Sequence, residues 1–330
     1  MIICRTPFRI SFFGGGTDYP IWYNDNGGAV INATINKYSY ITSRLIPHFF
    51  SYNYRIRYHE TEEVKTLDEI RHPSVRECAK YLQIEKGIEI NHNADLPSQA
   101  GLGSSSAFTV GILNALHALE NYMPTKRELA LEAIHVEQNL IGEFVGSQDQ
   151  FAAAFGGLNR ISFHSNNIDV DPVIISSERL TELEDNLMLF FTGFARTASE
   201  IAKKQIEVTP MKERELKSMM ELCDEALVNL TNKNESIEKF GLMLAEQWKI
   251  KRSMTDIISN KDIDDIYESG IKAGALGGKL LGAGGGGFML FFVPKGKQEK
   301  VKETLKSKIH VPFRFDFTGS KIIYYSHNDN

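Results

Sequence analysis

The segment Leu96–Ala107 reads Leu-Pro-Ser-Gln-Ala-Gly-Leu-Gly-Ser-Ser-Ser-Ala and decides how the chain is interpreted. It connects an expected strand at Ile88–Asn93 to an expected helix at Ser106–Leu119. Free N–H groups and the positive end of the dipole favour an anion at a helix start, glycines allow close backbone approach, and serines add hydroxyl donors. The segment therefore predicts a polyphosphate-binding loop. A serine N-cap after a glycine turn is the alternative.

Two other nucleotide loops do not fit the sequence. A Walker A loop needs Gly-x-x-x-x-Gly-Lys followed by Ser or Thr, but Lys279 is followed by Leu280, and Ala273 stands at the first glycine position. The run Gly282–Gly287 satisfies Gly-x-Gly-x-x-Gly. It follows an expected helix and precedes an expected strand, which is the reverse of the order in a dinucleotide fold.

Composition places the chain among globular proteins. Its 330 residues are 42% hydrophobic and 24% charged, and the formal net charge of -5 provides no global basic field for nucleic acid or an anionic bilayer. The cysteines Cys4, Cys78 and Cys223 are too widely spaced for a metal site, and an odd number cannot close a disulfide framework. A reducing cytoplasm is therefore expected, with no export signal and no membrane span.

The pattern of apolar residues predicts two α+β halves. The first half is expected to be rich in strands, and a Thr-x-x-Glu capping box opens a helix at Thr125–Asn139. The second half is expected to combine charged amphipathic helices with strands at Leu187–Thr192, Phe288–Val293, Phe313–Phe317 and Lys321–Tyr325. We expect an N-terminal domain at 1–180 and a C-terminal domain at 181–330.

Three motifs together resemble the GHMP kinase superfamily of galactokinase, homoserine, mevalonate and phosphomevalonate kinases. They are Thr6–Tyr19 with its triple glycine, the segment Pro97–Ala107, and Lys279–Gly287. They occur in the family's order and span nearly the whole chain. The resemblance implies a two-domain α+β fold with an N-terminal ribosomal-S5-like βαβ domain and a C-terminal ferredoxin-like α/β domain. ATP and the acceptor would lie in the cleft between the domains.

The resemblance also implies roles in phosphoryl transfer, which depends on positioning and charge neutralisation. Asp149 would accept or orient the proton of the acceptor hydroxyl, and Arg9 would neutralise charge at the transferring group. Ser105 and Glu137 would hold Mg²⁺, with Glu143 as a second candidate. The residues expected to bind ATP are Pro97, Gly101, Leu102, Gly103, Ser104, Ser105, Ser106 and Ala107.

The acceptor is expected to be a sugar. Thr17-Asp18-Tyr19 resembles the sugar-contacting triplet of galactokinases, in which a carboxylate can accept hydrogen bonds from two vicinal hydroxyls. Galactokinases carry Glu and His just before the threonine, whereas Gly15 and Gly16 stand here and would leave room. The residues expected to contact the acceptor are Gly16, Thr17, Asp18, Arg196, Gly284 and Gly285.

Several strings, including Gly14–Pro20 and Phe191–Arg196, are most similar to the heptose 7-phosphate kinases of this superfamily. That similarity implies phosphorylation of the C1 hydroxyl and a cation for the 7-phosphate. The candidates are Arg196, Lys37, Lys203 and Arg160. Alternatives are another anomeric sugar kinase, for fucose or galactose, and a catalytically silent ligand-binding paralogue. A small-molecule substrate is expected, without nucleic acid or membrane, and the sequence leaves open a monomer or a homo-oligomer.

Overall fold

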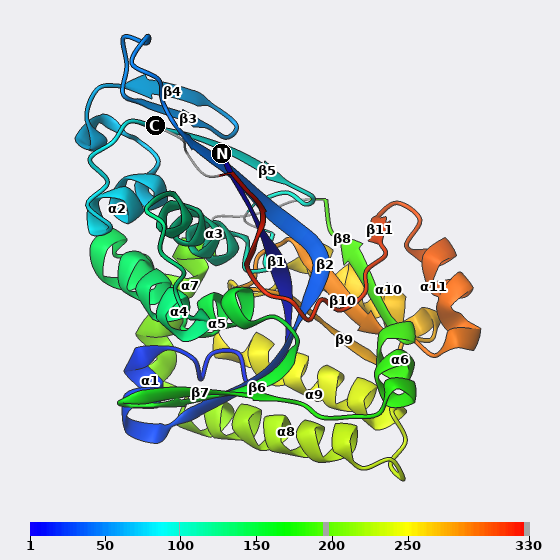
Figure 1. The fold of residues 1–330 in the computed structure, drawn as a ribbon. Helices are drawn as coiled ribbons and strands as arrows, with labels where there is room; N and C mark the ends of the chain where they lie inside the picture. Colours follow the sequence, from blue (N-terminus) through cyan, green and yellow to red (C-terminus); the bar gives the residue numbers. More distant parts are fainter. Residues whose placement is uncertain (99, 194–197, 327–330) are drawn as a thin grey trace.

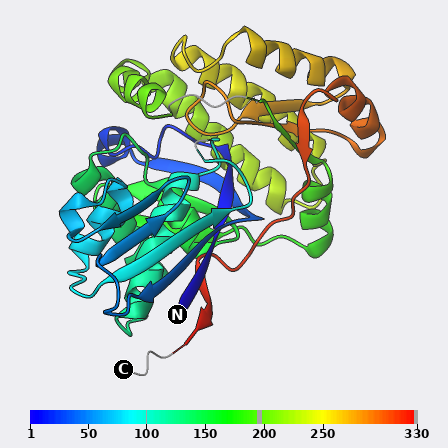
Figure 2. The same ribbon diagram turned by 90° about the horizontal axis from the view of Figure 1, so that it is seen from above.

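Two lobes, each built on its own β-sheet, make up the chain (Figures 1 and 2). The structure is a computed structural model that describes residues 1–98, 100–193 and 198–326. Seen from above, the blue, cyan and green N-terminal elements form one lobe, and the yellow and orange elements form the other.

The N-terminal lobe contains an eight-stranded sheet in the order β12-β1-β2-β5-β3-β4, with β6 paired to β2 and β7 to β6. The long strand β2 pairs along one edge with β1, and along its other edge first with β6 and then with β5. The strands are β1 (Ile2–Phe13), β2 (Gly28–Leu45), β3 (Tyr54–Arg57), β4 (Thr61–Val64), β5 (Ile88–Ala94), β6 (Leu158–His164), β7 (Asn167–Pro172) and β12 (Lys321–Tyr325).

Helices α2, α3, α4 and α5 gather on one side of this sheet (Figure 1). The predicted capping box forms, because Thr125 accepts from the Glu128 amide and Glu128 accepts from the Thr125 amide. The helix that it opens continues into a π-helical turn. The helices of this lobe are α1 (Pro20–Asn26), the 3₁₀ turn η1 (Leu67–Glu69), α2 (Pro73–Tyr81), α3 (Ser104–Leu119), α4 (Lys126–Ile134), the π-helix η2 (His135–Ile141) and α5 (Gln148–Phe155).

The C-terminal lobe contains a four-stranded antiparallel sheet in the order β11-β8-β10-β9. Its strands are β8 (Leu187–Phe191), β9 (Gly277–Leu280), β10 (Phe288–Phe292) and β11 (Ile309–Val311). Its helical segments are α6 (Ser177–Asp185), α7 (Ala198–Val208), η3 (Thr209–Met211), α8 (Glu213–Thr231), α9 (Glu238–Met254), α10 (Lys261–Ala273), η4 (Lys295–Lys297) and α11 (Gln298–Thr304).

Aromatic packing joins the two lobes. Phe240 on α9 makes edge-to-face contacts with Phe12 and Phe13 at the end of β1, with ring centroids 5.4 and 5.0 Å apart. All three rings are fully buried. Such pairs contribute about 0.5–1.5 kcal/mol beyond the burial of their area. The end of β1 is therefore held firmly against α9.

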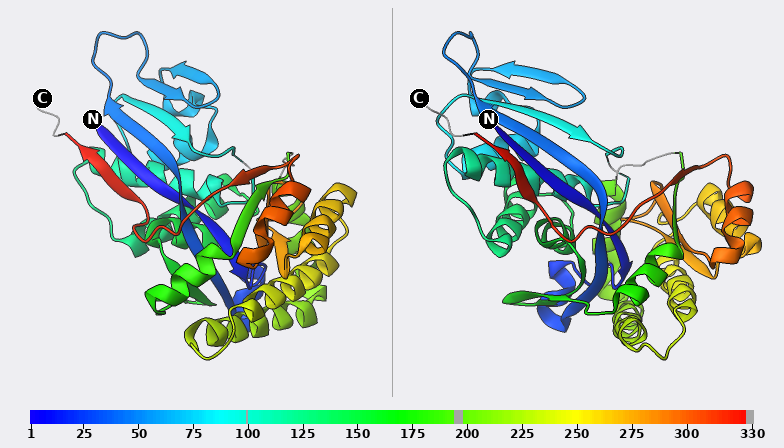
Figure 3. Two further views of the ribbon diagram at one scale, coloured as in Figure 1. Left: turned by 90° about the vertical axis from the view of Figure 1, so that its right-hand side faces the viewer. Right: turned by 45° about the vertical axis from the view of Figure 1, so that its right-hand side comes forward.

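The chain returns to the N-terminal lobe after β11, and β12 pairs antiparallel with β1 (Figure 3). The expected strand at Phe313–Phe317 does not form, and only an isolated bridge links Phe315 to Ile35. Because β12 belongs to the N-terminal sheet, part of 181–330 lies in the first lobe. The division near residue 180 remains a prediction.

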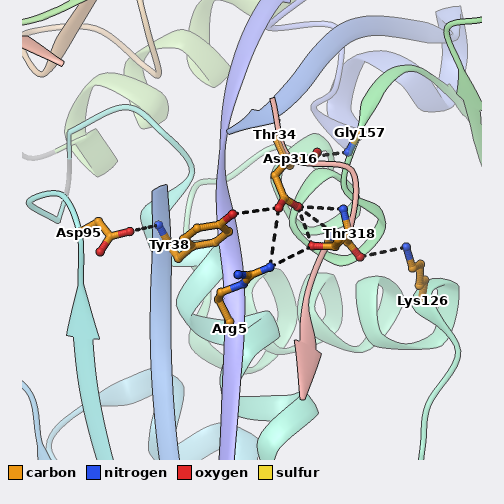
Figure 4. A network of polar contacts seen from close by, with 9 residues as sticks. Arg5, Thr34, Tyr38, Asp95, Lys126, Gly157, Asp316 and Thr318 are labelled. Atoms are coloured by element: carbon orange, nitrogen blue, oxygen red, sulfur yellow. Dashed lines mark hydrogen bonds and ion pairs between the residues drawn. The ribbon is translucent and has the colours of Figure 1, made fainter. Parts of the chain in front are cut away.

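Asp316 fastens this returning segment (Figure 4). Its buried carboxylate accepts from the Tyr38 hydroxyl at 3.0 Å and from the amide and hydroxyl of Thr318 at 2.8 Å each. Arg5 Nη2 forms an ion pair with Asp316 Oδ2 at 3.8 Å. The Asp316 backbone carbonyl accepts a hydrogen bond from the Thr34 hydroxyl. One side chain therefore ties the segment to both β1 and β2.

We predict that Asp316→Ala lowers the free energy of unfolding by about 3 kcal/mol, because buried donors to a charged group lose their acceptor. Asp316→Asn keeps one acceptor oxygen and should cost about 1 kcal/mol. Urea unfolding of the two variants measures the difference. Equal stability of both variants and the wild type would contradict this role.

Candidate active site

The predicted phosphate loop lies at the start of α3, which begins at Ser104. Gly101 and Gly103 adopt left-handed conformations, with φ of 82° and 69°, that favour glycine. A Cβ atom at Gly101 would lie 2.3 Å from the Leu281 carbonyl oxygen, and one at Gly282 would lie 2.4 Å from the Gly101 Cα. The phosphate loop and the C-terminal glycine loop therefore touch backbone to backbone.

Arg9 and Asp149 form a bidentate pair beside this loop. Arg9 Nε and Nη2 donate to the two Asp149 carboxylate oxygens, each at 2.6 Å, and Nη1 donates to the Gly101 carbonyl at 2.7 Å. A Cβ atom at Gly103 would lie 3.1 Å from Arg9 Cγ and 3.3 Å from Asp149 Oδ2. The structure thus brings together the phosphate loop, a cation from β1 and a carboxylate from α5.

The two residues predicted to hold the metal lie at different depths. Glu137 is fully buried and accepts from the Ser106 hydroxyl at 2.9 Å and from the Gln150 amide. Burial raises the pKa of Glu137 to about 7, against the lowering effect of neighbouring donors. The Ser105 hydroxyl instead bonds Glu143, whose pKa is also raised by burial. Ser105 and Glu137 therefore have separate hydrogen-bond partners.

The donor set suits a magnesium ion. Glu137 Oε1 is buried, and no described residue donates a hydrogen bond of ordinary geometry to it. The nearby Thr109 hydroxyl nevertheless lowers the pKa of Glu137. Carboxylate and hydroxyl oxygens are the hard donors that Mg²⁺ takes, commonly from one or two carboxylates together with substrate phosphates. The described residues contain no cluster of three or more His, Cys, Asp or Glu that could hold a metal.

Asp18 lines the same cavity as Arg9 and Asp149. Its carboxylate accepts from the Gly16 amide at 2.8 Å and from the Gln148 side chain at 2.9 Å, and burial raises its pKa. Thr17 is buried, and its hydroxyl donates to the carbonyls of Gly14 and Ala29. Thr17 therefore holds the turn, while Asp18 lies at the site.

The space expected beside the two glycines is only partly open. A Cβ atom at Gly15 would make ordinary contacts of 3.7 and 3.8 Å, but one at Gly16 would lie 2.8 Å from Gln205 Nε2. Gln205, from α7, is buried. A side chain of the C-terminal lobe therefore fills the place beside Gly16.

A cavity of about 500 Å³ joins these groups. Ten of the residues expected at the site line it: Arg9, Gly16, Asp18, Gly101, Gly103, Ser104, Ser105, Ser106, Glu143 and Asp149. Seven other expected residues are not among the lining residues: Pro97, Leu102, Ala107, Thr17, Glu137, Gly284 and Gly285. Gly284 and Gly285 pack against Ile258, and their neighbours Gly282 and Ala283 line the cavity.

The candidates for a second phosphate are scattered. Arg196 lies outside the described residues. Lys203 is exposed beside Phe144, which lines the cavity. Lys37 lines a separate surface groove, and Arg160 is paired with Asp224 at 2.9 Å. The order of preference expected from the sequence, Arg196 before Lys37, Lys203 and Arg160, stays a prediction.

Some cavity residues escaped the sequence analysis. Lys251 reaches the cavity from α9, and Gln148 orients Asp18 from α5. Neither belongs to one of the three motifs. Gln148 could have been noticed because it adjoins Asp149. Lys251 could have been noticed because it lies three residues after Trp248, on the face of α9 that carries the buried apolar residues.

Comparison with protein families is consistent with this geometry. Residues 73–157 match the family model for the GHMP kinases N terminal domain, and residues 219–310 match that for the GHMP kinases C terminal. The chain belongs to the GHMP kinase family. This GHMP kinase has the predicted two-domain fold. It is a sugar kinase of the GHMP type, a phosphotransferase with an alcohol acceptor that uses ATP.

Similar proteins cover nearly the whole chain. The D-glycero-alpha-D-manno-heptose 7-phosphate kinase of Campylobacter jejuni is 30% identical over 95% of this GHMP kinase and 96% of its own length. A galactokinase of Pyrococcus furiosus is 25% identical, with 92% of each chain covered. The structure of a D-glycero-D-manno-heptose 1-phosphate kinase from Bacteriodes thetaiotaomicron has a TM-score of 0.81 at 23% identity, with 99% and 100% covered.

Among the helices that the structure describes, none has the length and continuous apolar character of a bilayer span.

We predict that Asp149→Asn lowers kcat about 10²–10⁴-fold while ATP affinity stays nearly unchanged, because the amide cannot take the acceptor proton. Steady-state kinetics with ATP and a turned-over acceptor measure the effect. Near-wild-type turnover would remove Asp149 from the reaction.

We also predict that Gly146→Ala raises the KM for the acceptor about tenfold or more. Its Cβ would lie 1.9 Å from Asp18 Oδ2, so the carboxylate must move. The KM for ATP should change less than twofold. Gly296→Ala, with no atom within 4 Å of its Cβ, is the control for handling and folding. Equal changes in both KM values would contradict a role confined to the acceptor.

Proposed function

We propose that this GHMP kinase transfers the γ-phosphoryl group of ATP to the anomeric C1 hydroxyl of D-glycero-D-manno-heptose 7-phosphate. The product would be the 1,7-bisphosphate, for GDP-heptose and surface polysaccharide synthesis. The observation that carries the proposal is the bidentate Arg9–Asp149 pair held against Gly103 of the phosphate loop. The name of the Campylobacter jejuni relative supports the choice of acceptor.

Asp149 would act as the base or orienting group. As the C1 oxygen attacks the γ-phosphorus, the bond to ADP breaks and the hydroxyl proton passes to the Asp149 carboxylate. Arg9 bonds both carboxylate oxygens, so the carboxylate cannot rotate away from the loop. The pair therefore supplies the pre-positioning on which phosphoryl transfer depends.

The phosphate loop would hold ATP through the start of α3 and the serines Ser104, Ser105 and Ser106. Ser105 and Glu137 would hold Mg²⁺, which would neutralise charge on the phosphates when bound. Ser106, bonded to Glu137, would keep that carboxylate in place beneath the loop.

Asp18 would bind the sugar. Gly16 and Gln148 each hold one of its carboxylate oxygens, which leaves further lone pairs for the acceptor's hydroxyls. Thr17 would support the turn that carries Asp18. Gly284 and Gly285 would shape the C-terminal glycine loop. Arg196, which lies outside the described residues, stays the first candidate for the 7-phosphate. Lys203 is the candidate that stands beside a lining residue of the cavity, Phe144.

Another anomeric sugar is the second candidate acceptor, and the similarity to galactokinases favours it. The position of Gln205 beside Gly16 gives this wall a polar amide supplied by α7. A neutral sugar such as fucose or galactose would need no cation for a second phosphate, so the two proposals differ in their requirement for a charged acceptor.

We predict that, in a coupled ADP-release assay with Mg-ATP, heptose 7-phosphate gives a kcat/KM at least 100-fold above that of galactose, fucose, mannose, mevalonate or homoserine. Phosphorus NMR should then show a new phosphate on C1. Preference for a neutral sugar would replace the proposed acceptor. Absence of ADP release with every acceptor would favour a ligand-binding paralogue.

A further inference from the structure

Three cationic side chains enter the cavity: Arg9 from β1, Lys279 from β9 and Lys251 from α9. All three residues are at most 5% exposed. Burying a charge without a partner is costly, so the partners of each cation show whether it is already satisfied.

Two of these cations are already engaged. Arg9 donates to both Asp149 oxygens and to the Gly101 carbonyl. Lys279 donates to the carbonyls of Ser11 at 2.8 Å and Phe12 at 2.9 Å, which fixes it to the end of β1. Burial lowers the pKa of Lys279 well below its usual range. The charge of Arg9 is therefore paired with a carboxylate, and two of the three N–H groups of Lys279 are bonded to carbonyls.

Lys251 is different. Its ammonium donates to the Gly282 carbonyl, and the structure gives it no carboxylate partner within the part of the chain that it describes. An ammonium has three N–H donors, so at least one remains for a ligand in the cavity. Burial lowers the pKa of Lys251 to about 8, which reflects the cost of keeping this charge away from water.

The position of Lys251 is fixed by its partner. Gly282 packs against Gly101, and the Gly101 carbonyl accepts from Arg9. The charged groups that act on Lys251 are Arg9, Asp18, Asp149 and Lys279. Lys251 therefore lies where the phosphate loop meets the C-terminal glycine loop, close to the pair that would take the acceptor proton.

We propose that Lys251 is a further catalytic residue, and that its ammonium binds the oxygens of the transferring γ-phosphoryl group. The inference rests on the proposed point of transfer beside Asp149 but not on the identity of the acceptor. Arg9 then holds Asp149, while Lys251 neutralises charge on the transferring group. The division follows from their partners, because Arg9 is paired with the Asp149 carboxylate, whereas Lys251 donates to a carbonyl and has no carboxylate partner among the described residues.

Two substitutions separate charge from structure. Lys251→Gln keeps an N–H donor for Gly282 but removes the charge, whereas Lys251→Met removes both. We expect both variants to lower kcat about 10²–10³-fold, the effect of deleting one donor to developing charge. Thermal unfolding of each variant confirms that it is folded. Turnover by Lys251→Gln at the wild-type level would reduce Lys251 to a support for Gly282 and overturn the proposal.

Lys249→Met is the matched control. Lys249 lies on the same helix, is 73% exposed and is 3.4 Å from Glu246. It should leave kcat within twofold of the wild type, because an exposed pair contributes little. A loss equal to that of the Lys251 variants would show that α9 tolerates no change of charge, and would overturn the assignment.

Nucleotide binding tests the assignment without any acceptor. Calorimetry would compare ADP with the β,γ-imido analogue of ATP in the wild type and in Lys251→Gln. We expect the variant to lose about tenfold more affinity for the triphosphate analogue than for ADP, because only the analogue carries a γ-phosphoryl group. Equal losses would place Lys251 on the inner phosphates and contradict the proposal. This measurement stays valid if heptose 7-phosphate is not the acceptor.

The acceptor's own phosphate is the other source of such oxygens. If Lys251 bound it, Lys251→Gln would raise only the KM for a phosphorylated acceptor and leave kcat unchanged, which would overturn the proposal.

The pH profile gives a further readout. A lysine that must be charged loses its proton as pH rises through about 8, so the wild-type kcat/KM should fall above that pH. Lys251→Gln should lack this decline.

Discussion

The contact between two glycine loops is the constraint on which the site depends. Gly101 and Gly282 touch through their backbones, and a Cβ atom at Gly287 would lie 2.3 Å from the Ala100 carbonyl oxygen. All three glycines have positive φ. A side chain at any of them would separate the lobes and move the Gly282 carbonyl away from Gly101. The contact between these backbones brings the phosphate loop, the Arg9–Asp149 pair and Lys251 to one site.

Most charged groups in the cavity have partners supplied by the protein. Asp18 is held by an amide and by Gln148, Arg9 and Asp149 hold each other, and Lys279 is held by two carbonyls. Such groups gain strength from a low local dielectric, but they are costly when unpaired. Lys251 has only a carbonyl partner among the described residues. A ligand that carries negative charge would therefore complete the hydrogen bonds of this ammonium.

Much of the fold could be predicted from local patterns. The capping box at Thr125, the strand at Lys321–Tyr325 and the start of α3 beside the glycines follow from short-range chemistry. The pairing of β12 with β1 could not be predicted, because partners more than 300 residues apart leave no local signal. Phe313–Phe317 has the composition of a strand, but it is a connecting segment held by Asp316. Tertiary contacts decided its conformation.

The sequence by itself determined the family and predicted the phosphate loop and the residue types needed for phosphoryl transfer, because glycine spacing and helix starts carry their physical meaning locally. Only the tertiary structure decided which serine meets which carboxylate, which side chain fills the space beside Gly16, and which cations in the cavity are paired with a carboxylate. Those answers depend on α7, α9 and the C-terminal glycine loop reaching the N-terminal lobe. Long-range packing sets these distances, and no spacing along the chain encodes them.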